Sequence, residues 1–303
     1  MNLELRHLRY FVVLAEELNF ARAARRLHMT QPPLSQQIMQ LEDQMGTPLF
    51  IRGRRPLRLT DAGSELLVQS KRLLEHADNV VLSTKQAGRG ERGNLTIAFI
   101  TGSLPYLFPA IINRYTSKFP NVNLNLKELV SPFQRDALHT GSIDVGIMRP
   151  LQDEPNFETR ILLKERMLVA LPANHRYAQR QAIELEELAQ EPFVSFDRKE
   201  ANYFDVITTR IFGQIGSSPK IVQTASQMYT VLATVAAGMG LTFVPESAKA
   251  LSFPGVIFRE IAFATPIYAE LALGWRRERV QPVLTNFINT ALEVSEEMLP
   301  ITK

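Results

Sequence analysis

The chain has 303 residues, of which 45% are hydrophobic and 21% charged, and it contains no cysteine. This length exceeds one typical core and predicts two or three domains, while the composition is that of an ordered globular protein. The lack of cysteine excludes disulfide frameworks, thiolate zinc sites and cysteine nucleophiles. Charges interrupt the first apolar stretch, and the weakly polar stretch 231–244 is too short to cross a bilayer. We therefore expect a cytoplasmic protein with no secretion signal and no contact with a membrane.

The net charge of +3 is unevenly placed along the chain. Residues 1–60 carry nine arginines and five acids, a net charge of +4, which leaves −1 for the remainder. A basic segment on a neutral remainder favours contact with a polyanion such as DNA. An ordinary solvated basic surface has the same composition, so charge alone leaves both interpretations open.

Residues 1–60, which we call the head, show the periodicity of three short helices. A first helix, ending near Leu18, is indicated by apolar residues at three- and four-residue steps: Leu5, Leu8, Phe11, Val12 and Ala15. Asn19 is placed to cap a second helix over 21–27. Thr30 is expected to cap a third helix, whose first turn tolerates Pro32 and Pro33 because first-turn amides have no intrahelical partner.

The third helix of the head has an apolar side and an uncharged polar side. The buried stripe is expected to consist of Leu34, Ile38, Leu41 and Met45. The opposite face consists of Gln31, Ser35, Gln36, Gln37 and Gln40. Glutamine pairs bidentately with adenine, so this face suits base edges in a major groove. An ordinary polar helix surface is the alternative if the helix is considered alone.

A small hairpin is predicted to follow the third helix. Gly46 ends the helix, and 49–51 and 57–59 have the pattern of two short strands. The tip between the strands is basic, with Arg52, Arg54 and Arg55. Such a wing is suited to grip phosphates or to enter the minor groove.

These segments together resemble the LysR-type transcriptional regulators. The resemblance rests on the runs Phe20–Leu27 and Thr30–Ser35, on Leu41, Glu42, Gly46, Leu49, Phe50 and Arg52, and on Leu59–Gly63. It implies a winged helix-turn-helix that reads DNA, although Gln36 stands where several relatives carry arginine. The candidate DNA-binding residues are Arg22, Thr30, Gln31, Pro32, Pro33, Ser35, Gln36, Gln40, Arg52, Arg54 and Arg55.

A long helix is predicted from a cap at Thr60 to about Ala87. A heptad seam runs along it through Ala62, Leu66, Ser70, Leu73, Ala77, Val80 and Thr84, and Leu67, Leu74 and Val81 broaden it. The seam is expected to pair with a second copy, as the resemblance also implies, and packing on its own domain is the alternative. Residues 61–90 are thus expected to form a dimerisation helix and a hinge at Gly88–Gly93.

The remainder, 91–303, which we call the body, alternates strand and helix signals and predicts an α/β fold. Two lobes are expected, lobe I over 91–165 and 267–303 and lobe II over 166–266, because the final strand and helix return to lobe I in the family. By resemblance, the body is similar to type 2 periplasmic binding proteins. A solute-binding protein is the second hypothesis, although it would carry a secretion signal instead of a wing.

Ligands of open α/β sheets bind beyond the carboxyl ends of the strands. Candidate effector-binding residues at these positions are Thr101, Gly102, Ser103, Ser131, Arg149, Phe196, Asn202, Tyr203 and Gln227. The turn at Thr101–Ser103 precedes a helix whose free amides favour an anion, and a serine that only caps its own helix is the alternative.

The body resembles the family's effector-binding domain, particularly regulators that respond to benzoate, muconate and related acids. The motifs there are looser, with 141–146 and 235–240 the clearest, and Gly102 stands where some relatives carry an effector-binding serine. The resemblance implies a regulator with no cofactor; we expect an activator, and a repressor is the alternative. Its expected partners are double-stranded promoter DNA, RNA polymerase, an organic-acid effector and further copies of the chain in a dimer of dimers.

An enzyme and a metal site find little support in the sequence. The five histidines lie far apart, and none is joined to a carboxylate at ligand spacing. Gly238-Met239-Gly240 lacks the third glycine of a dinucleotide fingerprint, and no phosphate loop or nucleophile elbow occurs. A DNA-binding architectural protein that needs no ligand remains a third hypothesis.

Overall fold

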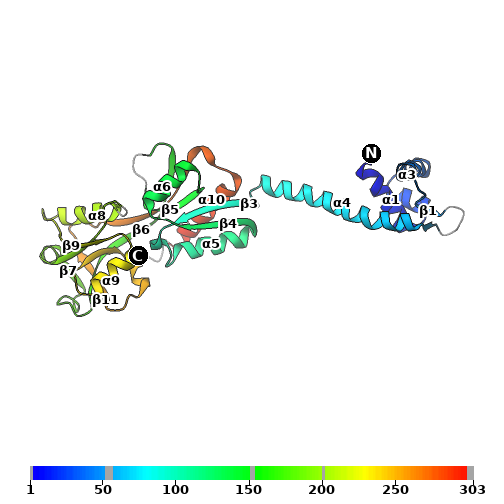
Figure 1. The fold of residues 1–303 in the computed structure, drawn as a ribbon. Coiled ribbons are helices and arrows are strands. Elements are labelled where there is room, and N and C mark those ends of the chain that lie inside the picture. Colours follow the sequence, from blue (N-terminus) through cyan, green and yellow to red (C-terminus); the bar gives the residue numbers. More distant parts are fainter. Residues whose placement is uncertain (1–2, 52–56, 151–153, 200–201, 299–303) are drawn as a thin grey trace. The chain divides into compact units, whose positions relative to one another are not determined.

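The structure is a computed structural model, and it describes residues 3–51, 57–150, 154–199 and 202–298. The chain divides into two compact units, Met1–Gln86 and Ala87–Lys303. Figure 1 shows the helices and strands of both units. The predicted wing-tip residues Arg52, Arg54 and Arg55 lie outside the described residues.

The head folds as three helices and a two-stranded antiparallel hairpin. Its elements are α1 (Leu5–Glu17), α2 (Phe20–Arg26), α3 (Gln31–Met45), β1 (Phe50–Ile51) and β2 (Arg58–Leu59). The predicted cap of α2 is confirmed, because the Asn19 side-chain oxygen accepts hydrogen bonds from the amides of Ala21 (2.9 Å) and Arg22 (3.1 Å). The predicted stripe of α3 is buried at Leu34, Ile38 and Leu41, while Met45 is half-buried; the core also contains Phe11, Leu14 and Phe50.

The predicted side-chain cap of α3 is wrong. Thr30 occupies the capping position with an extended backbone, but its side chain makes no capping hydrogen bond. A capping side chain accepts from the second or third amide of the helix. These positions are Pro32 and Pro33, which have no amide hydrogen to donate. The two prolines that suit the start of the helix therefore leave the Thr30 hydroxyl without a capping partner.

The base of the wing is held between two helices. From α3, the buried carboxylate of Glu42 accepts hydrogen bonds from the amides of Leu49 (2.8 Å) and Phe50 (3.2 Å). From the other side, the amide of Thr60 donates to the Leu49 carbonyl at 3.0 Å. A Cβ atom on Gly63 would lie 2.1 Å from the same carbonyl oxygen. The wing base is thus fixed both to α3 and to the start of the following helix.

That following helix, α4 (Asp61–Gly88), begins as predicted, because the Thr60 hydroxyl accepts from the Gly63 amide at 2.9 Å. The first part of the predicted seam packs on the head, where Ala62 and Leu66 join its core and Ser70 is 1% exposed. Further along, Leu73, Val80 and Val81 are about half exposed. Only the later part of the seam is therefore available to a partner.

Lobe I is a mixed sheet with helices on it (Figure 1). Its strand order is β4-β3-β5-β12-β6, in which β3 is parallel to β4 and β5, and β12 is antiparallel to β5 and β6. The elements are β3 (Arg92–Phe99), η1 (Thr101–Ser103), α5 (Leu107–Lys118), β4 (Asn121–Glu128), α6 (Ser131–Thr140), β5 (Val145–Met148), β6 (Phe157–Pro172), β12 (Tyr268–Arg276) and α10 (Pro282–Met298).

The last strand and helix return to lobe I, as expected. β12 lies between β5 and β6, and α10 packs beside α5. The buried Tyr115 of α5 donates its phenol hydrogen to the Val283 carbonyl of α10 at 3.0 Å, and its ring meets that of Phe287 edge-on. Burial raises the pKa of the Tyr115 phenol to about 12.

Lobe II is built on the second half of β6. There β6 pairs with β10 and β11, and β11 pairs with β7, while β8 and β9 form a separate parallel pair. The elements are β7 (Ala182–Glu184), α7 (Leu185–Leu188), β8 (Pro192–Phe196), α8 (Asn202–Gly213), β9 (Lys220–Ala225), α9 (Met228–Ala236), β10 (Thr242–Pro245), η2 (Glu246–Leu251) and β11 (Val256–Ala262). Phe193, Phe212 and Phe243 form an aromatic cluster at the centre of this core.

Two features of the body differ from the expectations. The boundary expected between lobe I and lobe II at 165–166 lies inside a single strand, because β6 begins at Phe157 and runs through both lobes. The expected hinge at Gly88–Gly93 is largely built into the body. Gly90 is buried with a φ of 68°, and a Cβ atom there would lie 2.4 Å from the backbone of Pro282. Only glycine fits this close approach.

Candidate functional site

The exposed face of α3 carries the predicted DNA-binding glutamines. Gln31, Gln36 and Gln40 are exposed, and Ser35 is half-buried. Pro32 and Pro33 are exposed at the first turn, next to Thr30. The helix thus presents side-chain amides at positions fixed by the burial of its opposite side. Exposed amides on a helix that stands on a rigid core are suited to reading base edges.

Arg22 and Gln37 have partners within the head. The Arg22 guanidinium donates to the Glu17 carbonyl and lies 3.4 Å from the Glu17 carboxylate. Gln37 donates from its side-chain nitrogen to the Gln40 side-chain oxygen at 3.1 Å. Arg22 is exposed, so a phosphate would compete with Glu17 for its guanidinium.

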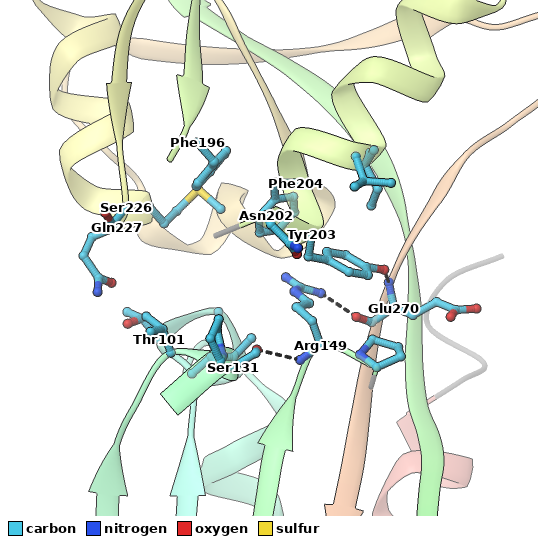
Figure 2. A pocket seen from close by; sticks show the side chains of 18 of the residues that line it. Thr101, Ser131, Arg149, Phe196, Asn202, Tyr203, Phe204, Ser226, Gln227 and Glu270 are labelled. Carbon is cyan, nitrogen blue, oxygen red and sulfur yellow. Dashed lines mark hydrogen bonds between the residues drawn. The ribbon is translucent and has the colours of Figure 1, made fainter. Parts of the chain in front are cut away.

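A pocket of about 700 Å³ lies in the body between residues of lobe I and lobe II. Eight of the nine predicted effector-binding residues line it: Thr101, Gly102, Ser131, Arg149, Phe196, Asn202, Tyr203 and Gln227. Figure 2 shows Thr101 and Ser131 on one side of the pocket, Phe196 and Gln227 on the other, and Arg149 beside Tyr203. This volume is in the range of pockets that hold small organic ligands.

Arg149 is the central charged group of the pocket. Its side chain leaves the end of β5, is 5% exposed, and donates from Nη1 to the Glu270 carbonyl at 2.8 Å. The guanidinium lies over the rings of Phe204 (4.7 Å) and Tyr203 (5.3 Å). Within the described residues its Nε has no hydrogen-bond partner. Burial lowers the pKa of Arg149, against the opposing charge of Glu165, but arginine stays protonated in proteins.

Tyr203 joins the two lobes next to Arg149. It belongs to α8 of lobe II, and its phenol oxygen accepts a hydrogen bond from the Glu270 amide of lobe I at 2.7 Å (Figure 2). Burial raises the pKa of this phenol, although the hydrogen bond from Glu270 and the charge of Arg149 oppose the shift. The backbone of Glu270 therefore holds both side chains, through its amide and its carbonyl.

Three further predicted residues make specific contacts at the pocket. The Ser131 hydroxyl accepts from the Arg149 amide at 3.0 Å and ties α6 to the end of β5. Thr101 donates from its hydroxyl to the Glu128 carboxylate at 2.6 Å. Phe196 stacks on Phe204, with ring centroids 4.6 Å apart, and forms part of the apolar wall.

Ser103 is the exception among the predicted effector-binding residues. It is 2% exposed, it does not line the pocket, and its hydroxyl donates to the Ile100 carbonyl at 2.7 Å. The short helix η1 turns this side chain into the protein. The alternative, a serine that caps its own helix, does not hold either, because the hydroxyl donates to a preceding carbonyl and α5 begins only at Leu107, without a side-chain cap.

Sequence reasoning missed six charged residues of the pocket: Glu128, Arg135, Glu154, Lys164, Arg210 and Glu270. Glu128 is the last residue of β4, so the same rule of strand ends points to it. Lys164 and Glu270 lie within strands and form an ion pair at 2.7 Å. Their position follows from the long strand β6 and its pairing with β12, which the local pattern did not reveal.

The described parts of the chain contain no group of three or more His, Cys, Asp or Glu residues placed to hold a metal ion. Among the helices that the structure describes, none is long and apolar enough to span a membrane.

Comparisons with known proteins agree with this division of the chain. A family model described as a bacterial regulatory helix-turn-helix protein of the lysR family matches residues 5–64, and one described as a LysR substrate binding domain matches 88–296. The chain belongs to the LysR family of bacterial transcriptional regulators. This LysR-family chain is 38% identical over 291 residues to the transcriptional regulator AlsR of Bacillus subtilis, covering 95% of each protein. It is 35% identical over 286 residues to the Hca operon transcriptional activator HcaR of Escherichia coli, covering 94% of this chain and 96% of that protein.

Solved structures of LysR regulators have the same fold. The crystal structure of CbnR bound to its target DNA superposes with a TM-score of 0.85 at 26% identity, covering 97% of this chain and all of that one. Full-length BenM gives a TM-score of 0.60 at 29% identity, covering 97% of each chain. The LysR-family protein described here is therefore a DNA-binding transcriptional regulator with an effector-binding domain, and its relatives are regulators and not enzymes.

Proposed function

We propose that this LysR-family chain activates transcription in the cytoplasm in response to an organic acid, aromatic or aliphatic, that binds between the two lobes. The observation that carries the proposal is the buried Arg149 guanidinium, which lines a pocket and keeps a hydrogen-bond donor without a partner in the described residues. A buried charge is costly unless it is paired, and a carboxylate matches the geometry of a guanidinium.

The walls of the pocket suit the rest of such a ligand. Phe196, Ile100 and Met228 supply apolar surface, and Asn202 and Gln227 supply amide groups. A pocket that combines apolar surface with a few well-placed polar groups fixes the orientation of a small ligand. Aromatic and aliphatic acids both fit this description. The likeness to HcaR and BenM is consistent with such a sensor.

The response to the ligand is proposed to pass through the contact between the lobes. Arg149 and Tyr203 both hold the backbone of Glu270, so a carboxylate that binds Arg149 acts where the lobes meet. A ligand shifts the arrangement of the lobes only by its difference in affinity for the two arrangements. The shift is proposed to change the spacing of the heads, the bend of the DNA and contact with RNA polymerase.

Oligomerisation is proposed to occur through the later part of α4. Leu73, Val80 and Val81 are spaced as a helix seam and stay exposed in the single chain. Pairing two heads joins two DNA half-sites and raises affinity through the linkage. We propose a dimer of dimers in which the effector domains join the two pairs.

The acid effector is tested by thermal unfolding of the full chain with a panel of aromatic and aliphatic carboxylic acids. A ligand that binds the folded state raises the melting temperature in a saturable way. We expect a rise with at least one acid and its loss in Arg149→Met. Losing a charged hydrogen-bond partner weakens binding by about 30-fold or more.

The matched control is Arg135→Met, because Arg135 also lines the pocket but lies against Asp136 and Glu154. This variant loses the same charge and is expected to keep the rise in melting temperature that the acid causes. A panel without any saturable rise contradicts the acid effector. An equal loss in both variants contradicts the role of Arg149.

A further inference from the structure

The pocket carries opposite charges on the two sides of one short turn. On one side, Arg149 is 95% buried, and a Cβ atom on Gly102 would lie 3.4 Å from its Nη2. On the other side, Thr101 donates its hydroxyl hydrogen to a carboxylate oxygen of Glu128 at 2.6 Å. Thr101 and Gly102 are neighbours in η1, so the pocket places a cation and an anion on either side of that turn.

Glu128 has no cationic partner in the part of the chain that the structure describes. The neighbouring Lys127 donates instead to the Ser142 carbonyl at 3.0 Å. Glu128 is exposed at the pocket, and its carboxylate receives the Thr101 hydroxyl hydrogen alone among the described side chains. An ionised carboxylate only accepts hydrogen bonds, and its two oxygens offer about four lone-pair sites. Acceptor capacity therefore remains for a ligand.

These two groups select opposite ends of a ligand. A carboxylate at Arg149 gains a charged hydrogen bond, whereas a second carboxylate near Glu128 meets a like charge in a partly enclosed site. A hydroxyl or an ammonium group at the same place donates a hydrogen bond to Glu128. Next to Glu128 the pocket is thus suited to a hydrogen-bond donor and disfavours a second carboxylate, whereas Arg149, and Arg210 elsewhere in the lining, favour a carboxylate.

We propose that the effector is a monocarboxylic acid that carries a hydroxyl or amino group, and that Glu128 determines this specificity. The inference rests on the proposed acid effector and specifies the functional group at the end of that ligand away from its carboxylate. The Glu128 carboxylate would repel the second carboxylate of a dicarboxylic acid, and this repulsion lowers the affinity for dicarboxylic acids of similar size.

The test compares matched ligands by calorimetric titration of the full chain. The probes are 3- and 4-hydroxybenzoate against the benzene-1,3- and benzene-1,4-dicarboxylates, and 4-hydroxybutyrate against succinate. We expect at least one hydroxy acid to bind about 10-fold more tightly than its matched dicarboxylate. In Glu128→Gln we expect the dicarboxylate to gain affinity and the difference to shrink to about threefold or less.

The control is Glu154→Gln, because Glu154 also lines the pocket but lies 3.6 Å from His139 and 3.9 Å from Arg135. It removes the same charge and is expected to leave the preference unchanged. Equal or tighter binding of dicarboxylates to the unaltered chain overturns the role of Glu128 and leaves the acid effector standing. Equal changes in both variants also overturn it. A chain that binds none of these probes overturns both proposals.

Discussion

The head and the body place their functional side chains in opposite ways. On α3 the candidate contacts are exposed, come from one continuous segment and are aligned by the burial of Leu34, Ile38 and Leu41 on the other side. In the body, Arg149 is buried and meets Tyr203, 54 residues further along the chain, and Glu270 still further. A surface that reads DNA needs a rigid frame, whereas a sensor needs buried charged groups that a ligand of opposite charge can pair with. The two regions should therefore respond to different substitutions.

The largest effect on the head is expected from Glu42→Ala. The change leaves the buried amides of Leu49 and Phe50 without their acceptor, which costs about 1–3 kcal/mol for each group. We expect faster hydrogen exchange at these amides and weaker DNA binding, with acid binding unchanged.

Glu42→Gln is the matched control for that change, because it alters the charge equally and keeps a side-chain oxygen as an acceptor. It is expected to restore most of the exchange protection and DNA affinity. If both variants behave alike, the charge of Glu42 matters and its hydrogen bonds to the wing base do not.

Gly63→Ala is expected to destabilise the head by about 1–3 kcal/mol, because the new methyl group would lie 2.1 Å from the Leu49 carbonyl oxygen. Differential scanning calorimetry of the full chain should show a lower transition temperature for the head. Gly88→Ala is the control, since nothing lies within 4 Å of its added carbon. A neutral Gly63→Ala variant would show that α4 moves freely against the wing base.

Gln36→Ala tests whether the exposed face of α3 reads bases. Loss of a bidentate contact is expected to relax base preference by about 1–3 kcal/mol at one position of the site. Arg52→Ala, at a residue outside the described ranges, is expected to weaken binding to all sequences and to lower the salt slope by about one unit. Selection from a random DNA library, followed by titrations at several salt concentrations, separates the two effects. Equal effects of both variants on specific and random DNA would contradict these roles.

Tyr115→Phe is expected to have the smallest effect, about 1 kcal/mol at neutral pH, through loss of the hydrogen bond to Val283. Since burial raises the pKa of Tyr115 to about 12, the folded state holds its proton while the unfolded state releases it. This residue's contribution to stability should therefore fall as pH rises from about 10 to about 12. Urea unfolding across this pH range should show that the free energy of unfolding falls more steeply in the unaltered chain than in Tyr115→Phe. Equal decreases of the free energy of unfolding in the two proteins would contradict the assignment of this pH dependence to Tyr115.

The same contrast explains what the sequence could predict. The helices of the head, the cap at Asn19 and the exposed glutamines follow from local periodicity, and the structure has them where expected. The cap at Thr30 failed because Pro32 and Pro33 leave no amide to bind. In the body, the rule of strand ends found Arg149, Ser131 and Tyr203. It could not show that η1 buries Ser103 or that the long strand β6 brings Lys164 to the pocket.

The most direct test of the account joins the two regions in one measurement. DNA fragments selected by the full chain are footprinted, and their bending is measured, with and without a saturating amount of the acid that gives the largest thermal shift. We expect the acid to change the footprint or the bend for the unaltered chain and to change neither for Arg149→Met. Identical footprints and bends with and without the acid in the unaltered chain would contradict the claim that an acid at Arg149 controls DNA binding.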